Sequence, residues 1–293
     1  MCGFDQSELI IRKVQNMLVS QYVEDVVSKR QYKYATKQSY IKGIKSLGIW
    51  DRDVSSLTPQ FFYEALDGIS NLNTRKALTI ICRSVFKELG ICAELKVIEG
   101  IPRTYELPSQ NDLHRVIERS KYKNYLYLCM YAGLRIGEAC AVTPKAVHKE
   151  GSSYWLHVDK AWSQDGLNLG SAKTIGKVMI PDWLAEQILA MKPADLWQKG
   201  NPTLLITWSC NSISKKGEKI HINPHMLRHW FATDMVRRSV PIHVIMRQMR
   251  HKNINTTMRI YAQVQSSDFV DALPVRPQDK AEPTAKIIQL VRK

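Results

Sequence analysis

The chain has 293 residues, of which 44% are hydrophobic, 24% charged and 9% aromatic. This composition is typical of a folded protein and excludes a disordered, collagen-like or low-complexity chain. Lysine and arginine total 42 against 27 aspartates and glutamates, and the resulting formal net charge of +15 favours a polyanionic partner.

The start of the chain and its cysteines indicate where the protein works. The first nine residues contain Asp5 and Glu8 and lack the basic and then apolar order of a signal peptide. No apolar run approaches the length that a membrane span needs. The six cysteines are scattered and never spaced as C-x-x-C, which is typical of reduced thiols. We therefore expect a cytoplasmic protein that makes no membrane contact.

The amino-terminal part, residues 1–98, carries helical periodicity throughout and predicts four or five helices. Thr58 and Pro59 mark one helix start, and the polar run at 70–74 marks a turn before another. Basic and aromatic residues alternate between 29 and 45, which is typical of a surface that faces phosphates and equally of a solvated helix face. The candidates for phosphate contact are Lys33, Lys37, Lys42, Lys45 and Arg75.

A segment with one glycine and two prolines, residues 99–108, interrupts the helical pattern and predicts an interdomain linker. Residues 109–265 then predict a second domain of mixed class, and residues 266–293 a C-terminal tail. Helices are expected at 110–119, 122–132, 136–142 and 181–191, and as three short helices within 225–265. Strands are expected at 154–158, 167–172 and 177–180, with turns at 165–166 and 174–176.

One helix start in the second domain carries a candidate anion site. Asn223 can cap this helix, and Pro224 can occupy its first turn. His225 and Arg228 are three residues apart and would lie on one face near the amino-terminal end. The free backbone N–H groups and the helix dipole attract anions to that end. The pair therefore predicts a clamp for a phosphate group.

Four sequence boxes in the second domain extend this prediction. The run HMLRHWFAT at 225–233 resembles the His-x-x-Arg box of the tyrosine recombinase (phage integrase) family, and AGLRIGEA at 132–139 resembles the box with that family's first catalytic arginine. The run SAKTIGK at 171–177 is similar to the β-hairpin that carries the catalytic lysine. The run RHKNINTTMRIY at 250–261 is similar to the closing box with the second histidine and the nucleophilic tyrosine. The boxes stand in the family's order and approximate spacing.

This resemblance implies a fold and an activity. The implied fold is mostly α with a small antiparallel sheet (α+β), in which a helical DNA core-binding domain and a catalytic domain form a C-shaped clamp on DNA. The implied activity is site-specific recombination, in which DNA is cleaved and rejoined through a 3′-phosphotyrosine and a Holliday junction without metal, cofactor or ATP.

The resemblance also implies the partners. The substrate would be double-stranded DNA with a specific recombination site, bound by a homotetramer whose chains are monomers when free. Accessory DNA-bending proteins can take part, and binding to DNA would associate the protein with the nucleoid. The five basic candidates within 1–98 then become candidate DNA contacts.

The matching positions imply the catalytic residues. Arg135 and Arg228 match the two arginines that neutralise the phosphate, and guanidinium groups suit this task because they stay charged and bind phosphate oxygens bidentately. His225 and His251 would hydrogen-bond the same phosphate. Tyr261 matches the nucleophile, and His225 would accept its proton.

Lys173 matches the general acid that protonates the departing 5′ oxygen. It stands just before the predicted turn at 174–176, with Gly176 available for a positive φ, so we expect it at a hairpin tip that reaches the minor groove. Lys177 is the alternative for this role. Glu138 is expected to orient Arg135 or cap its helix, or in the plainest interpretation to form an ordinary surface ion pair.

Two positions depart from the family's pattern. The family usually has glycine before the second histidine, whereas this chain has Arg250. A non-glycine residue in a left-handed helix end costs about 1 kcal/mol, so we expect the local turn to differ. The interval from His251 to Tyr261 is ten positions, one more than usual, and the loop 252–255 can absorb the extra residue.

Other interpretations stay open on the sequence alone. His225 and His229 have the i,i+4 spacing of zinc ligands, but no H-E-x-x-H motif or cysteine cluster completes a site. The same residues also suit a type IB topoisomerase-like enzyme or a hairpin-forming strand transferase, and the scaffold and charge suit a non-cleaving DNA-binding protein. A metal-dependent nuclease is a third interpretation. The apolar and basic end of the chain, 285–293, fits docking on a neighbouring protomer and a frayed tail equally well.

Overall fold

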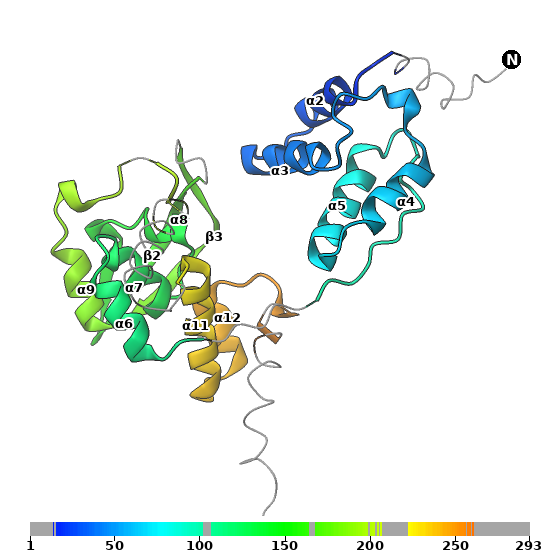
Figure 1. Cartoon of the computed structure of the whole chain (residues 1–293). Helices are drawn as coiled ribbons and strands as arrows, with labels where there is room; N and C mark the ends of the chain where they lie inside the picture. The colour runs from blue at the N-terminus through cyan, green and yellow to red at the C-terminus, as the bar shows by residue number, and fades with distance from the viewer. Residues whose placement is uncertain are drawn as a thin grey trace, which may run out of the picture. The chain divides into compact units, whose positions relative to one another are not determined.

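The computed structural model describes residues 14, 16–101, 107–163, 168–198, 200–202, 204, 206, 222–255, 257–258 and 260. The chain divides into two compact units, Met1–Thr104 and Tyr105–Lys293, and the division falls inside the segment where we expect the linker (Figure 1). Each unit has its own hydrophobic core. None of the helices in the described ranges is both long and apolar enough to cross a membrane.

The first unit is built from helices. Thr58 and Asn71 begin two of them as the sequence predicts, because their side-chain oxygens accept hydrogen bonds from the backbone N–H of Phe61 at 3.2 Å and of Thr74 at 3.0 Å. The elements of this unit are α2 (Val19–Lys29), α3 (Tyr34–Lys45), the 3-10 turn η1 (Val54–Ser56), α4 (Pro59–Asp67) and α5 (Leu72–Val85).

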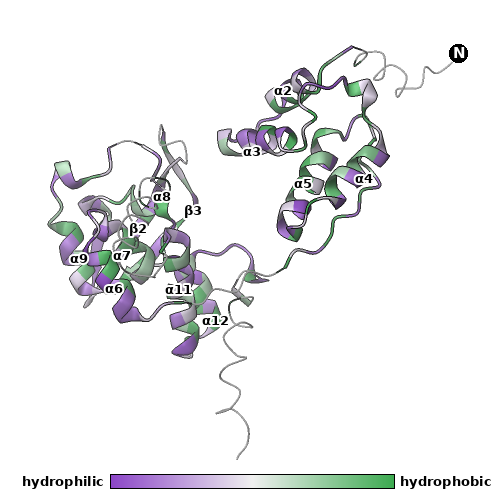
Figure 2. Ribbon diagram, viewed as in Figure 1, coloured by the Kyte–Doolittle hydropathy of each residue, from purple (hydrophilic) through white to green (hydrophobic). Residues whose placement is uncertain are grey.

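The core of the first unit forms where one face of each helix meets the others. Tyr22 of α2 stacks on Phe86 with ring centroids 5.7 Å apart, and Phe62 of α4 lies 5.2 Å from the same ring. Gly43 lets α3 approach α5, since a Cβ there would lie 2.8 Å from Cδ1 of Ile81. Figure 2 shows both hydrophobic and hydrophilic positions on these helices, which is typical of helices that bury one face.

The second unit combines helices with one small sheet. Strands β1 (Val147–Glu150), β2 (Ser153–Trp162) and β3 (Leu169–Ile180) form an antiparallel sheet in the order β1-β2-β3. The helical elements are α6 (Gln110–Glu118), α7 (Lys123–Tyr131), α8 (Ile136–Ala139), η2 (Pro144–Ala146), α9 (Asp182–Leu189), η3 (Pro193–Asp195), α11 (Pro224–Arg237) and α12 (Ile242–Met249). The prediction of a mostly α fold with a small antiparallel sheet is therefore confirmed.

Helix α7 is the centre of the core of the second unit. Residues 125–130 are all buried, so this helix is covered on every side. Helix α11 packs along it, and α6, α8 and α9 also contact it. Because α7 cannot shift without repacking the core, the residues that follow it, including Arg135, start from a fixed position.

The sheet differs from the predicted one. Residues 169–172 and 177–180, expected in two separate strands, belong to the single strand β3, and β2 continues to Trp162. Residue 167, where the first of these strands is expected to begin, lies outside the described residues. The chain reverses between these strands, where the N–H of Ser163 donates to the carbonyl of Asn168 at 2.8 Å. The predicted turn at 165–166 lies outside the described residues. Strand β1 escapes prediction because three of its four residues are exposed and it lacks the apolar alternation of a half-buried strand.

The segment 174–176 is not the turn that the sequence predicts. Gly176 pairs with Val158 in the ladder between β2 and β3, and the register shifts before Lys160 pairs with Ser171. Gly176 does not adopt a positive φ. A Cβ at this position would lie 3.2 Å from Cδ of Arg250, so the glycine allows a close approach by that side chain. Lys173 therefore lies in an irregular part of a strand and not at a hairpin tip.

A side chain closes the outer edge of β3 at one position. Gln248 of α12 accepts a hydrogen bond from the backbone N–H of Met179 at 3.1 Å and donates one to the carbonyl of Met179 at 2.7 Å. The side-chain amide thus makes both bonds that a neighbouring strand would make there. This contact also fixes α12 against the sheet.

Candidate active site

A sharp turn after α7 brings the first arginine box close to the last two helices of the unit. Gly133 has a φ of 64°, a conformation that glycine adopts without strain. A Cβ there would lie 2.7 Å from Sδ of Met249 and 2.7 Å from Cδ1 of Phe231. Glycine is therefore required for the backbone conformation and also for close packing. The turn leads directly to Arg135, the N-cap residue of α8.

Arg135 is held by a carboxylate three residues further along the chain. Its backbone N–H donates to Oε2 of Glu138 at 2.9 Å, and its Nη1 donates to Oε1 at 2.9 Å. Glu138 is 2% exposed, whereas 34% of the Arg135 side chain is exposed. The pair is therefore not an ordinary surface ion pair. A buried carboxylate both caps the helix start and orients a guanidinium that solvent can reach.

Arg228 stands near the start of α11, which begins as predicted because Asn223 accepts a hydrogen bond from the N–H of Met226 at 2.9 Å. Arg228 is 3% exposed. Its Nη1 donates to the carbonyl of Gly133, and its Nη2 donates to the carbonyl of Met249 at 2.7 Å. Both terminal nitrogens thus bind backbone carbonyls, and each keeps a second hydrogen for another acceptor.

Burial makes the charged form of the Arg228 guanidinium less favourable. Burial, followed by the charge of Arg135, lowers the pKa of Arg228 from 12.5 to about 9, so the guanidinium is still a cation at neutral pH. Two neighbouring cations repel each other, and an anion bound between them relieves that repulsion. The arrangement therefore suits a phosphate group.

Helix α12 ends in a left-handed residue that is not glycine. Arg250 has a φ of 51° and a ψ of 46°. The N–H groups of Arg250 and His251 bond to the carbonyls of Arg247 at 3.1 Å and of Met246 at 3.0 Å, which is the closure that glycine usually makes at a helix end. The expectation that the local turn would differ is wrong. The buried guanidinium of Arg250 forms an ion pair with the buried Glu138.

His251 follows this turn and is neutral at pH 7. Burial, followed by the positive charges of Arg228, Arg135 and Arg250, lowers the pKa of His251 to about 4. Its Nδ1 lies 2.9 Å from Oγ1 of Thr257. A neutral imidazole can donate one hydrogen bond and accept another, so Nε2 can take a second partner.

His225 is exposed on the first turn of α11, near the other two histidines of the site. A positive charge on His225 would lower the pKa of both His229 and His251. His229 is half-buried, burial is the main cause of its lowered pKa, and its Nδ1 lies 3.4 Å from Oγ1 of Thr233 on the same helix. Within the described ranges, no group of three or more His, Cys, Asp or Glu residues is arranged to hold a metal ion.

The two candidate lysines of β3 differ in their surroundings. Lys177 forms an ion pair with Glu150 of β1. Lys173 is exposed and has no ion-pair partner in the part of the chain that the structure describes. The next residue, Thr174, accepts a hydrogen bond through its carbonyl from Nε of Arg250 at 3.4 Å. Lys173 therefore directly precedes a residue that contacts the arginine cluster. Within the described residues it is also the one of the two lysines that forms no ion pair.

The predicted nucleophile, Tyr261, lies outside the described residues. The preceding residue, Ile260, is 7% exposed and belongs to a small apolar cluster with Val236, Ile245 and Met249. The chain is therefore anchored to α11 and α12 one residue before Tyr261.

Comparison with known proteins shows to which family the chain belongs. The sequence model of the phage integrase family matches residues 109–268, more than half of the chain. The chain belongs to the phage integrase family. No protein of curated function matches it by sequence. The matched segment contains all the predicted catalytic residues, which are Arg135, Lys173, His225, Arg228, His251 and Tyr261.

Solved structures with a similar fold include other integrases and recombinases. The Tn1549 transposon integrase in complex with a circular intermediate DNA has a TM-score of 0.66 at 14% identity, over 87% of this chain and 100% of that chain. A lambda integrase dimer bound to a COC′ core site has a TM-score of 0.64 at 14% identity, over 88% and 81%. The XerH recombinase in a post-cleavage complex with palindromic difH has a TM-score of 0.60 at 15% identity, over 85% and 82%. The likeness shows a shared fold.

Arg250 is a residue of this site to which sequence reasoning gave no role. The sequence signal is an arginine at a position where the phage integrase family usually has glycine, and that signal suggests only a change of turn. The residue that the side chain binds, Glu138, stands 112 positions earlier, so the contact becomes visible only in the folded chain.

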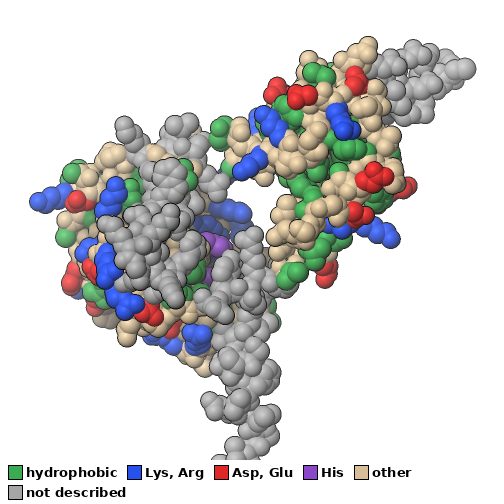
Figure 3. Space-filling model, viewed as in Figure 1, with side chains coloured by type: hydrophobic (Ala, Val, Ile, Leu, Met, Phe, Trp, Pro, Cys, Tyr) green, Lys and Arg blue, Asp and Glu red, His purple; other side chains and the backbone are tan. Residues whose placement is uncertain are grey.

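The candidate DNA contacts of the first unit differ in how available they are. Lys33, Lys37, Lys42 and Lys45 lie on α3 or at its start, and all except the partly exposed Lys37 are exposed. Nζ of Lys45 lies 4.4 Å from the centre of the Trp50 ring. Arg75 of α5 is already engaged in an ion pair with Asp67. Figure 3 shows lysine and arginine side chains in view on both units.

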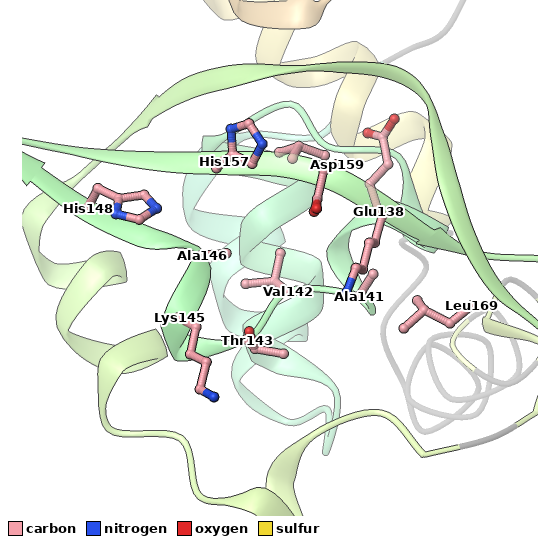
Figure 4. Close-up of a pocket in the computed structure, with 12 residues that line it drawn as sticks. Glu138, Ala141, Val142, Thr143, Lys145, Ala146, His148, His157, Asp159 and Leu169 are labelled. Carbon is pink, nitrogen blue, oxygen red and sulfur yellow. The ribbon is translucent and has the colours of Figure 1, made fainter.

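A separate cavity of about 270 Å³ lies between the α8–η2 segment and the sheet (Figure 4). His148 and His157 line it from neighbouring strands, and both are exposed. Glu138 also borders this cavity, but Figure 4 shows its carboxylate directed away from Thr143 and Lys145. The carboxylate that binds the two arginines therefore does not serve this cavity.

Proposed function

We propose that this member of the phage integrase family is a site-specific DNA recombinase that forms a 3′-phosphotyrosine through Tyr261 and needs no metal ion or ATP. The observation that carries the proposal is the pair of Arg135 and the buried Arg228, which are close enough to repel each other, beside the neutral His251. Buried neighbouring cations are costly, and a protein that only binds DNA has no need of them. A phosphodiester that gathers negative charge in its transition state fits this pair best.

The proposed cleavage step is a transesterification. The hydroxyl of Tyr261 attacks the phosphorus atom, an O–P bond to tyrosine forms, and the bond to the 5′ oxygen breaks. His225 accepts the tyrosine proton, and Lys173 donates a proton to the 5′ oxygen. When the 5′ hydroxyl of a partner strand attacks the phosphotyrosine, the proton transfers reverse and the phosphodiester is restored without external energy.

The two arginines would share the phosphate unequally. Arg135 is the one that solvent reaches, so its guanidinium would contact the non-bridging oxygens most directly. Arg228 already donates to two carbonyls and would offer its remaining hydrogens. The neutral His251 would donate a hydrogen bond to the same phosphate through Nε2.

The partner in this proposal is duplex DNA with a specific recombination site. Residues 1–98 would form the core-binding domain, with the exposed lysines of α3 on the DNA backbone, and would close a C-shaped clamp with the catalytic domain, 109–265. The formal charge of +15 supports this, and so do the DNA complexes of the Tn1549 integrase and of XerH. Two strand exchanges through a Holliday junction would take place in a homotetramer on nucleoid DNA in the cytoplasm, with the tail, 266–293, docked on a neighbouring protomer.

The test uses duplex fragments from the DNA that flanks this gene, nicked so that the cleaved end diffuses away. Wild-type protein and Tyr261→Phe are incubated with these fragments in EDTA, and an SDS-stable protein–DNA adduct is the readout. We expect an adduct with wild type alone, while both proteins shift the fragments equally in a native gel. An adduct that persists in Tyr261→Phe would refute Tyr261 as the nucleophile. A shift without any adduct would favour a non-cleaving DNA-binding protein, and cleavage seen only in a parallel incubation with Mg²⁺ in place of EDTA would favour a metal-dependent nuclease.

A further inference from the structure

We infer that Arg250 is a positioning residue that ties strand β3, and with it Lys173, to the Arg135–Glu138 pair. The inference rests on the proposed function, because it concerns the general acid of the proposed cleavage step. It adds a role for a residue that replaces the glycine usual at this position in the phage integrase family.

The side chain of Arg250 connects three segments of the second unit. It leaves the chain at the end of α12, and its Nη2 forms an ion pair with Oε2 of Glu138 on α8. Its Nε donates to the carbonyl of Thr174 on β3 at 3.4 Å. Its Cδ occupies the space next to Gly176, where a Cβ would lie only 3.2 Å away. One guanidinium therefore reaches both the first arginine box and the lysine strand.

The part of β3 that carries Lys173 has little support from the sheet. Gly176 pairs with Val158 and Ser171 pairs with Lys160, but residues 172–175 have no partner in the ladder. Lys173 itself makes no ion pair within the described residues. The hydrogen bond from Nε of Arg250 to the carbonyl of Thr174 therefore links this segment to the arginine cluster.

Stability does not explain the choice of arginine. The residue adopts a left-handed conformation that glycine would adopt without strain. Its Nη1 is buried and, among the residues that the structure describes, has no hydrogen-bond partner. Glycine would avoid both costs, and strained or unsatisfied groups of this kind persist where a site requires them.

Arg135 does not depend on Arg250 in the same way. Glu138 binds the backbone N–H of Arg135 through Oε2, which Arg250 shares, and binds Nη1 of Arg135 through Oε1, which Arg250 does not contact. Removing the guanidinium of Arg250 should therefore leave the first arginine in place and release the segment around Thr174. The expected defect is in protonation of the leaving group and not in neutralisation of the phosphate.

The experiment measures single-turnover adduct formation on the nicked duplex at saturating protein. The scissile phosphate carries either its natural bridging 5′ oxygen or a bridging 5′ sulfur, and a thiolate leaves without needing a proton from an acid. The variants are Arg250→Gly, Arg250→Lys, Lys173→Ala and Arg135→Ala. The matched control is Arg247→Ala, which removes an exposed arginine from the same helix.

We expect Arg250→Gly to lower the rate on the oxygen substrate by about 10- to 100-fold, because a small displacement of the acid is enough. The sulfur substrate should restore the rate to within a few-fold of wild type, as it should for Lys173→Ala but not for Arg135→Ala. Arg250→Lys keeps the charge but not the planar fork, so its defect should be intermediate. Arg247→Ala should match wild type on both substrates.

A wild-type rate for Arg250→Gly on the oxygen substrate, or a defect that sulfur does not restore, would overturn the inference alone. Absence of any adduct with the wild-type protein would overturn the proposed function and the inference together. Glycine suits the backbone at this position, so Arg250→Gly should fold, and urea unfolding of each variant checks this. If Arg250→Gly does not fold, Arg250→Lys takes its place: a defect on the oxygen substrate that the sulfur substrate restores supports the inference, and a defect that sulfur does not restore overturns it.

Discussion

Nη2 of Arg228 donates to the carbonyl of Met249 at 2.7 Å, so the second arginine box holds the last residue of α12. Its Nη1 donates to the carbonyl of Gly133, two residues before Arg135. The segments that lead to Arg135 and to His251 are therefore both bound to one buried cation. Since α11 packs along the central helix α7, this cation has a fixed position in the core.

Arg228→Ala should destabilise the fold as well as abolish catalysis. The substitution leaves two carbonyls in a buried region without their donor, and each unsatisfied carbonyl costs about 1 to 3 kcal/mol. Urea unfolding should show a decrease in this range or above it. Arg237→Ala, which removes an exposed arginine from the last turn of the same helix, should change the free energy of unfolding by less than about 0.5 kcal/mol. Equal effects of the two variants would contradict the structural role of Arg228.

Gly133→Ala and Gly151→Ala separate the cost of backbone strain from the cost of packing. Both glycines have a positive φ, 64° and 62°. A Cβ at Gly151 would meet no atom within 4 Å, whereas one at Gly133 would meet two side chains at 2.7 Å. We expect Gly151→Ala to cost about 1 kcal/mol, and Gly133→Ala to cost about 1 to 3 kcal/mol more because of overpacking. Urea unfolding of the two variants measures the difference, and equal destabilisation would mean that the turn after α7 is not closely packed.

The stability of the protein should depend on pH through His251. In the unfolded chain this histidine binds a proton near its ordinary pKa of 6.5, whereas in the folded chain it does so only near 4. The unfolded state therefore binds more protons between these values, and the free energy of unfolding falls as the pH falls from about 6.5 to about 4. His251→Gln should make this dependence shallower in urea unfolding at several pH values. It should not remove the dependence, because the lowered pKa of His229 acts in the same direction. An unchanged slope would show that His251 is solvated in the folded protein.

The lysines of α3 should govern how binding to DNA depends on salt. The double variant Lys42→Ala and Lys45→Ala removes two exposed cations, so the slope of log K against log salt concentration should become shallower by about 0.9 for each phosphate that the protein no longer neutralises. Titrations of a labelled duplex between about 50 and 200 mM salt measure the slope. Arg75→Ala serves as the comparison and should change the slope little, because Asp67 already binds that arginine. If Arg75→Ala made the slope shallower and the double lysine variant did not, Arg75 and not the lysines of α3 would be the residue that neutralises DNA phosphates.

Features that depend on residues close together in the sequence could be predicted. The side chains of Thr58 and Asn223 cap their helices because the donors lie three residues further along the chain. The arginine and histidine boxes could be located for a similar reason, since each is a short run with a defined order of residue types. The pairing of Glu138 with Arg135 also follows from a spacing of three residues.

Features that depend on distant residues could not be predicted in this way. Gly176 suggests a turn when only its neighbours are considered, but the structure uses it to admit the side chain of Arg250 from the end of α12. The ion pair of Arg250 with Glu138 joins two boxes that were interpreted separately. Strand β1 gives no periodic signal because most of its side chains are exposed.

The amide of Gln248 on the edge of β3 affects how copies of this protein meet. An open sheet edge is a template on which a second chain can build its own strand, and such joining leads to aggregation. At Met179 the two backbone groups that a foreign strand would use are already occupied. Two residues further, Pro181 has no N–H to offer. A second copy of this chain could not add a strand at this end of the sheet, so two copies could touch there through side chains without merging their sheets.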